Sequence, residues 1–154
     1  MNIARLVSTL RTALCGLALA VVAAGAPVLA ADDEVVMYKD PNCGCCGKWA
    51  EHMRSHGFKV REIATRDMGT VKREAGLPAE LGSCHTAKVG GYIVEGHVPA
   101  ADVRRMLDER PKIVGISAPG MPMGSPGMEG PYPPDRYEVV SFDRKGGVEV
   151  FSRH

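Results

Sequence analysis

Three cysteines fall within four positions of this chain, at Cys43, Cys45 and Cys46. They follow directly on the apolar run Val35-Val36-Met37-Tyr38, which is typical of a β-strand. A structural cysteine is buried among apolar neighbours, whereas the residues between and after these thiols are glycines, which supply bendable backbone. Because the thiolate is both a nucleophile and a metal ligand, this thiol run predicts either a redox site or a metal site.

The segment after the thiol run is expected to be a helix, because Trp49, Ala50 and Met53 have the spacing of one helix face. Cys43 and Cys46 have the Cys-x-x-Cys spacing, which places Cys46 at the N-terminus of this helix. The dipole at that end favours the thiolate and lowers a cysteine pKa from about 8.5 to between about 3.5 and 7.5.

The N-terminal stretch is typical of a secretory signal peptide. Arg5 and Arg11 precede an uncharged run over 12–31 that is rich in Ala, Leu and Val. A run of about 20 uncharged residues could also anchor a chain in a membrane, but this one is weakly hydrophobic and contains Pro27. We therefore expect cleavage near Ala30 and no stable membrane anchor on the mature chain.

Cleavage at this point separates a signal peptide, residues 1–30, from one mature domain, residues 31–154. The signal peptide carries Cys15 and two arginines but no acid, so the 19 basic and 18 acidic residues of the whole chain become 17 and 18. A net charge of about −1 excludes a broadly basic surface for nucleic acid. Export to the periplasm places the four remaining cysteines in an oxidising compartment, where thiols persist only if they are paired, liganded or repeatedly reduced.

Turn and cap residues divide the mature chain into short elements. Gly57 suits the end of the first helix, Asp67 the N-cap of the second, and Pro99 the first position of the third, while Gly90-Gly91 suits a tight turn between two strands. These signals predict, in chain order, a strand over 35–39, the helix after the thiol run, a strand over 58–63, a helix over 68–75, strands over 87–89 and 92–94, and a helix ended by Pro111.

Residues 117–134 are rich in Pro, Gly and Met and predict a loop, since Pro and Gly suit neither a helix nor a central strand. Alternation returns over 137–142 and over 148–151, which predicts a C-terminal β-hairpin. The loop carries three methionines without apolar periodicity, here called the loop methionines: Met121, Met123 and Met128. Their thioethers bind copper(I) without deprotonation, which makes them weaker candidate ligands beside the alternative of a plain connector.

The order of elements, with Cys-x-x-Cys between the first strand and the first helix, resembles the thioredoxin and glutaredoxin fold over residues 35–110. The resemblance implies an α/β fold in which the loop before the third strand approaches the Cys-x-x-Cys motif and carries a cis-proline. Here that loop reads Ser83-Cys84-His85-Thr86, so a fourth thiol and an imidazole replace the proline. This departure argues against disulfide exchange as the function.

If the two loops meet, they bring together Cys43, Cys45, Cys46, Cys84 and His85. Soft thiolates select copper(I), zinc or iron–sulfur clusters. Zinc takes four ligands in a tetrahedral site, which leaves Cys45 without a role. Copper(I) accepts two or three sulfurs and allows thiolates to bridge, so it accounts for the additional thiol and can be bound as more than one ion.

Four stretches of the chain carry a second resemblance: residues 41–49 around the thiol run, the Cys84-His85-Thr86 triplet, residues 90–99 and residues 120–129. Together they are similar to the CopG family of periplasmic copper-resistance proteins. The resemblance spans nearly all of the mature chain. It implies a thioredoxin-like fold that holds copper at the four cysteines and His85, for storage, delivery or redox turnover, with other periplasmic copper-handling proteins as partners.

Two other functions stay open. A periplasmic thiol–disulfide oxidoreductase would use Cys43 as the attacking thiol and Cys46 as the resolving thiol. Under this hypothesis the protein is an enzyme. A thioredoxin-like ferredoxin would bind a two-iron cluster, but assembled clusters are seldom exported by a signal for unfolded chains. A disulfide between Cys43 and Cys46 with a purely structural role is a further alternative.

Individual residues also have structural interpretations. Cys84 could be a buried core thiol, and His85 could be satisfied by backbone hydrogen bonds. His52 and His56 are expected to face solvent on the first helix. His97 either approaches the second loop or ends a strand, and it is not among the predicted ligands.

Overall fold

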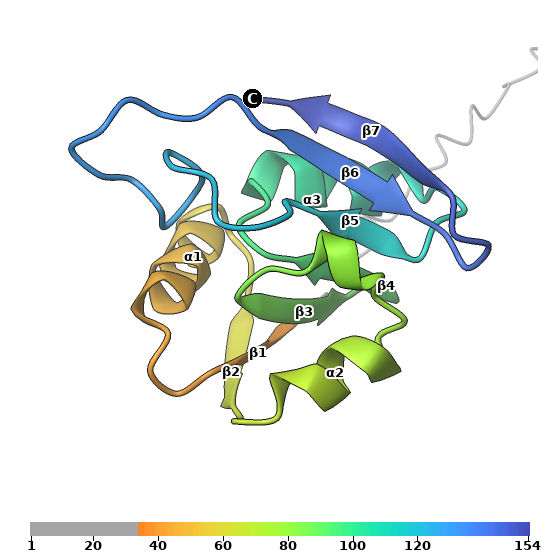
Figure 1. Ribbon diagram of the computed structural model, residues 1–154, viewed down its shortest axis with the longest axis horizontal. Coiled ribbons are helices and arrows are strands. Elements are labelled where there is room, and N and C mark those ends of the chain that lie inside the picture. Colours follow the sequence, from red (N-terminus) through yellow and green to blue (C-terminus); the bar gives the residue numbers. More distant parts are fainter. Residues whose placement is uncertain (1–33) are drawn as a thin grey trace, which may run out of the picture.

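The computed structural model describes residues 34–154, which form a seven-stranded mixed sheet with three α-helices (Figure 1). The predicted signal peptide, residues 1–30, lies outside the described residues. Within the described part of the chain, the helices are too short and too polar to cross a bilayer. In chain order the elements are β1 (Val35–Lys39), α1 (Gly44–Ser55), β2 (Val60–Ala64), α2 (Met68–Glu74), the 3-10 turn η1 (Ala79–Leu81), β3 (His85–Val89), β4 (Tyr92–Glu95), α3 (Ala100–Glu109), β5 (Gly115–Ser117), β6 (Glu138–Phe142) and β7 (Val148–Arg153).

The strands lie in the order β2-β1-β3-β4-β5-β6-β7. β1 pairs with β2 and β4 with β5 in parallel, while the other neighbouring pairs are antiparallel. The sheet thus begins with the β1-α1-β2 unit that carries the thiol run and ends with the β6–β7 hairpin at the opposite edge (Figure 1).

Two clusters of buried side chains lie on opposite faces of the sheet. Successive residues of a strand point to opposite faces, and in β4 Val94 belongs to the larger cluster while Ile93 belongs to the smaller one. Trp49 of α1 and Val103 of α3 belong to the larger cluster, and Leu81 of η1 to the smaller one. Helices α1 and α3 therefore cover one face, and the segment around η1 covers the other.

The predicted order of strands and helices is confirmed from β1 to α3, and so is the terminal hairpin. Asp67 caps α2 as expected, because its Oδ1 accepts the Thr70 N–H at 3.0 Å. Several boundaries were wrong: β2 begins at Val60, β3 begins two residues earlier than predicted, at His85, and Pro99 is the N-cap of α3 and not its first residue. Strand β5 was not predicted, because three residues are too few to show alternation and its Ser117 was assigned to the loop.

Candidate metal centre

A tight turn after β1 places the thiol run at the start of α1. The Asp40 carboxylate accepts the N–H of Asn42 at 2.8 Å, and its backbone carbonyl accepts the N–H of Cys43 at 3.0 Å. Such Asx turns reverse the chain within a few residues. Cys43 is the N-cap of α1, and Cys43 and Cys46 are joined by a disulfide.

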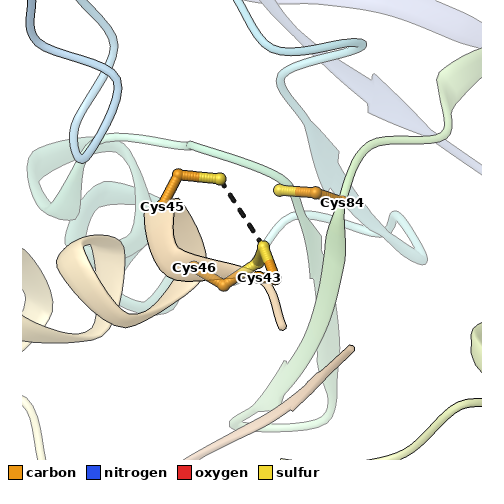
Figure 2. Close-up of side chains that lie close together, drawn as sticks. All are labelled: Cys43, Cys45, Cys46 and Cys84. Carbon is orange, nitrogen blue, oxygen red and sulfur yellow. Dashed lines mark hydrogen bonds between the residues drawn. A yellow bond between two sulfur atoms is a disulfide. The ribbon is translucent and has the colours of Figure 1, made fainter. Parts of the chain in front are cut away.

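Four cysteine sulfurs meet at this end of α1. Cys84, from the segment before β3, approaches the thiol run so that the Sγ atoms of Cys43, Cys45, Cys46 and Cys84 all lie within 4.8 Å of one another (Figure 2). The Sγ atoms of Cys43 and Cys45 are 3.5 Å apart. We call this group the sulfur cluster. The two loops that the sequence analysis paired therefore do lie together.

Two imidazoles extend the sulfur cluster on the side of Cys84. The Cys84 Sγ lies 3.0 Å from His97 Nε2 and 3.4 Å from His85 Nδ1, and these three residues form a second group with the spacing of metal ligands. His97 Nδ1 lies 2.7 Å from the Pro126 carbonyl, to which it must donate its proton. The His97 Nε2 lone pair therefore points at Cys84, in the arrangement typical of a metal-binding histidine oriented by a backbone carbonyl.

His85 lies deeper than His97 in the same group. Its ring is fully buried and packs at 4.5 Å from the Trp49 ring. Its Nε2 is buried without a hydrogen-bond partner among residues 34–154. Because the Gly96 backbone also interacts with this ring, the expected alternative of a histidine satisfied by backbone hydrogen bonds fits only in part.

Burial sets the protonation states of the group. Desolvation, with the Cys45 thiol nearby as a smaller cause, raises the pKa of Cys84 to about 12. Desolvation also lowers the pKa of His85 and of His97, so both imidazoles are neutral at pH 7, the form that binds metals. A soft cation would stabilise the thiolates that burial disfavours, so this donor set fits such an ion.

A buried carboxylate holds the Cys84 segment, residues 83–86, in place. Glu95 at the end of β4 is fully buried and accepts the Ser83 N–H and the Thr86 hydroxyl, each at 2.6 Å. The Lys72 ammonium of α2 forms an ion pair with the same carboxylate and donates to Thr86 Oγ1 at 3.1 Å. Charge-assisted hydrogen bonds from Glu95 and Lys72 thus fix the segment that carries Cys84.

The loop over residues 118–137 packs against both parts of the site (Figure 1). At one point Gly120 N donates to Gly82 O at 3.1 Å, and Met121, 53% exposed, follows directly. At another, Gly127 has φ +84°, and a Cβ there would lie 2.8 Å from the Cys45 carbonyl oxygen. Of the loop methionines, Met123 and Met128 are half-buried, and Met128 follows the glycine that touches α1.

His97 is the site residue that the sequence analysis omitted, although the chain contains a signal for it. The two-residue turn Gly90-Gly91 sets the antiparallel register of β3 and β4, in which Thr86 faces Glu95. Continuing that register by two places brings Cys84 opposite His97. The register of a predicted hairpin could therefore have paired the two residues.

The remaining histidines lie away from the sulfur cluster. His56 is exposed as expected, but His52 is half-buried, because its Nε2 accepts the backbone N–H of Ala100 at 3.1 Å. This bond satisfies one of the free N–H groups at the start of α3. His52 is therefore a helix cap and does not face solvent freely.

Comparisons with known proteins add a family to this geometry. Residues 81–128 match the family model described as "Protein of unknown function, DUF411". Two solved structures named "Copper resistance protein copG", Form 1 and Form 2, are each 44% identical to this chain. Each match covers 79% of this chain, and the two matches cover 97% and 98% of the solved chains, with TM-scores of 0.75 and 0.76. The search of curated proteins found no match.

Proposed function

Because the chain belongs to the family of the copper resistance protein CopG, we propose that it binds copper(I) at the sulfur cluster and the adjoining imidazoles, in the service of copper resistance. One observation carries the proposal: four cysteine sulfurs lie within 4.8 Å of one another, with His97 Nε2 3.0 Å from one of them. The ligands are Cys43, Cys45, Cys46 and Cys84, with His85 and His97 on the far side of Cys84.

The number and softness of the donors favour copper(I) over zinc. A tetrahedral zinc site uses four ligands, whereas this site offers four sulfurs and two imidazole nitrogens. Copper(I) prefers soft sulfur, and thiolates this close together can bridge, so the site can hold more than one ion. All four sulfurs become available once the Cys43–Cys46 disulfide takes up two electrons and two protons.

The fold proposed for residues 35–110 is thioredoxin-like. Its support is the order β2-β1-β3-β4 with β1 and β2 parallel, together with a Cys-x-x-Cys pair at the N-terminal end of α1. The peptide bonds of residues 34–154 are all trans, and Ser83-Cys84 stands where thioredoxins carry a cis-proline. A thiol ligand thus occupies the position from which thioredoxins bind substrate backbone.

The proposal also includes export. Residues 1–30 act as a cleaved signal peptide, residues 31–154 form the mature domain, and the protein works in the periplasm. There it takes copper from, or passes it to, other copper-handling proteins. The loop methionines assist this transfer as thioether ligands over the site.

A thiol–disulfide oxidoreductase is the second candidate. The observation that favours it is the disulfide between Cys43 and Cys46 at the start of α1. The partial burial of Cys84 beside that disulfide disfavours it, since the thiol takes the space needed by a substrate. An insulin-reduction assay should therefore run far below thioredoxin, and a rate equal to that of thioredoxin would promote this candidate.

The experiment for the leading proposal is copper(I) competition. Mature protein, residues 31–154, is reduced and titrated anaerobically against a copper(I) chelator, with free thiols counted before and after. We expect at least one tightly bound ion, weaker binding in Cys84→Ser and in His97→Ala, and unchanged binding in His56→Ala, which alters an exposed histidine outside the cluster. No copper uptake by the parent would refute the proposal, and unchanged affinity in Cys84→Ser would remove Cys84 from the ligand set.

A further inference from the structure

Two thiols of the sulfur cluster remain free when the Cys-x-x-Cys pair is closed. With Cys43 and Cys46 joined, Cys45 and Cys84 are the free cysteines of residues 34–154. Figure 2 shows their side chains extending toward one another, one from α1 and one from the segment before β3. Their sulfurs lie within 4.8 Å, and both residues are partly exposed.

We propose that Cys45 and Cys84 are a second redox pair, which closes to a disulfide by exchange with small-molecule disulfides. The protein would then have three states, with four thiols, one disulfide or two disulfides. The second disulfide links α1 to the Cys84 segment, two parts of the chain that the first one does not connect.

Formation of the Cys45–Cys84 disulfide requires only a short movement of the two sulfurs. A disulfide needs a sulfur separation of about 2.05 Å, and one change of χ1 rotamer displaces a cysteine sulfur by about 3 Å. That displacement covers the gap left by a starting separation within 4.8 Å. Neither residue lies inside a strand whose pairing would have to break, since β3 begins at His85.

The chemistry balances with one equivalent of the small disulfide. The Cys45 thiolate attacks one sulfur of RSSR, forming a mixed disulfide and releasing RS⁻. The Cys84 sulfur then attacks Cys45 Sγ, and the second RS⁻ leaves and takes the Cys84 proton. The first RS⁻ takes the proton that Cys45 lost on ionising, so two protein thiols are oxidised and RSSR is reduced to two RSH.

The consequence for copper rests on the proposed function. In the one-disulfide state two thiols and two imidazoles remain as donors, those of Cys45, Cys84, His85 and His97. In the two-disulfide state no cysteine of residues 34–154 can ionise, and only the imidazoles remain. Oxidation would therefore lower the copper capacity in two steps and empty the site at the second. The pair itself can be tested without copper.

The test uses mature protein oxidised in glutathione/glutathione-disulfide buffers and digested with trypsin without reduction. Cleavage after Lys39, Lys48, Arg73 and Lys88 yields peptide 40–48, with three cysteines, and peptide 74–88, with Cys84. In the parent we expect two successive losses of two thiols and, after the second, a cross-linked pair of these peptides. In Cys43→Ser/Cys46→Ser the same cross-link should form, and there it can only join Cys45 to Cys84.

The controls separate this pair from the others. Cys45→Ser should lose the second step and leave Cys84 as a free thiol or a glutathione adduct. Glutathione adducts at both Cys45 and Cys84, or dimers between chains, without the cross-linked peptides in either the parent or the double serine variant would overturn the proposal. Copper that stays bound after both disulfides have formed would instead contradict the ligand assignment, while leaving the redox pair intact.

Discussion

Replacing Glu95 by glutamine tests how the buried carboxylate holds the Cys84 segment. The side chain is fully buried and binds Ser83, Thr86 and Lys72. Glutamine keeps the volume and one acceptor but removes the charge and one acceptor oxygen. The variant therefore leaves the Lys72 ammonium without its counter-charge in a largely desolvated position.

The expected decrease in the free energy of unfolding follows from the loss of this charge. Removing one partner of a buried ion pair costs about 3 to 5 kcal/mol. The Lys72 side chain is 22% exposed, so water reaches part of the ammonium and the lower end applies, about 3 kcal/mol. With a urea slope of about 1 to 3 kcal/mol per molar, the unfolding midpoint should fall by about 1 to 3 M.

The assay is urea unfolding followed by the fluorescence of Trp49, the single tryptophan, which is fully buried beside His85. Copper(I) competition gives the second readout, because a displaced Cys84 segment should weaken binding by about 10-fold, as with other residues that orient metal ligands. Glu138→Gln is the matched control, since the Glu138 and Arg153 side chains are 47% and 73% exposed. Their ion pair should be worth no more than about 1 kcal/mol.

Equal stability losses in Glu95→Gln and Glu138→Gln would refute the reasoning that burial decides the cost. A loss of about 3 kcal/mol with unchanged copper affinity would show that Glu95 stabilises the fold without positioning Cys84. The double variant Lys72→Met/Glu95→Gln should recover part of the stability, because no unpaired ammonium then remains buried.

Three further outcomes are expected. Burial lowers the pKa of His85 and His97 in the folded state, so below about pH 6.5 the unfolded chain binds more protons than the folded chain. The unfolding free energy, measured by urea titration from pH 7 to pH 5, should therefore fall by up to about 1.4 kcal/mol per pH unit for each histidine. A flat profile would contradict their buried neutral state. Gly127→Ala should cost more stability than Gly146→Ala in thermal melts, because both glycines have positive φ but only Gly127 has backbone atoms 2.8 Å from an added Cβ, and equal costs would refute the close packing of the loop on α1. Replacing all three loop methionines with leucine should slow copper transfer to a chelator in stopped-flow experiments while keeping the equilibrium capacity, and equal rates would reduce the loop to a connector.

Local signals in the sequence predicted much of the fold. The face formed by Trp49, Ala50 and Met53 and the cap at Asp67 depend on residues within one or two turns, so their pattern is visible in the chain. The course of the loop over residues 118–137 was not predictable, since it depends on contacts with distant parts of the chain, such as those of Gly120 with Gly82 and of Gly127 with the backbone of α1. No periodic pattern records a contact of that kind.

The parts of the site that depend on residue type were predictable from the sequence. The parts that depend on packing between distant elements were not. Four thiols in two short segments indicate a soft-metal or redox site from composition alone. The direction of His97 depends on the Pro126 carbonyl, a partner distant in the chain, and the buried anchor at Glu95 depends on Lys72 from another helix. Such long-range partners emerge only once the elements are packed.

The turn between β3 and β4 limits how this site can change in evolution or in protein engineering. The turn holds two glycines far along the strands from the thiols, yet its length decides which residue stands opposite Cys84. Inserting one residue there would slip the strands by one place and turn His97 to the other face of the sheet. The length of the turn therefore helps to specify the site. A single insertion or deletion at the turn would damage the site more than most substitutions there.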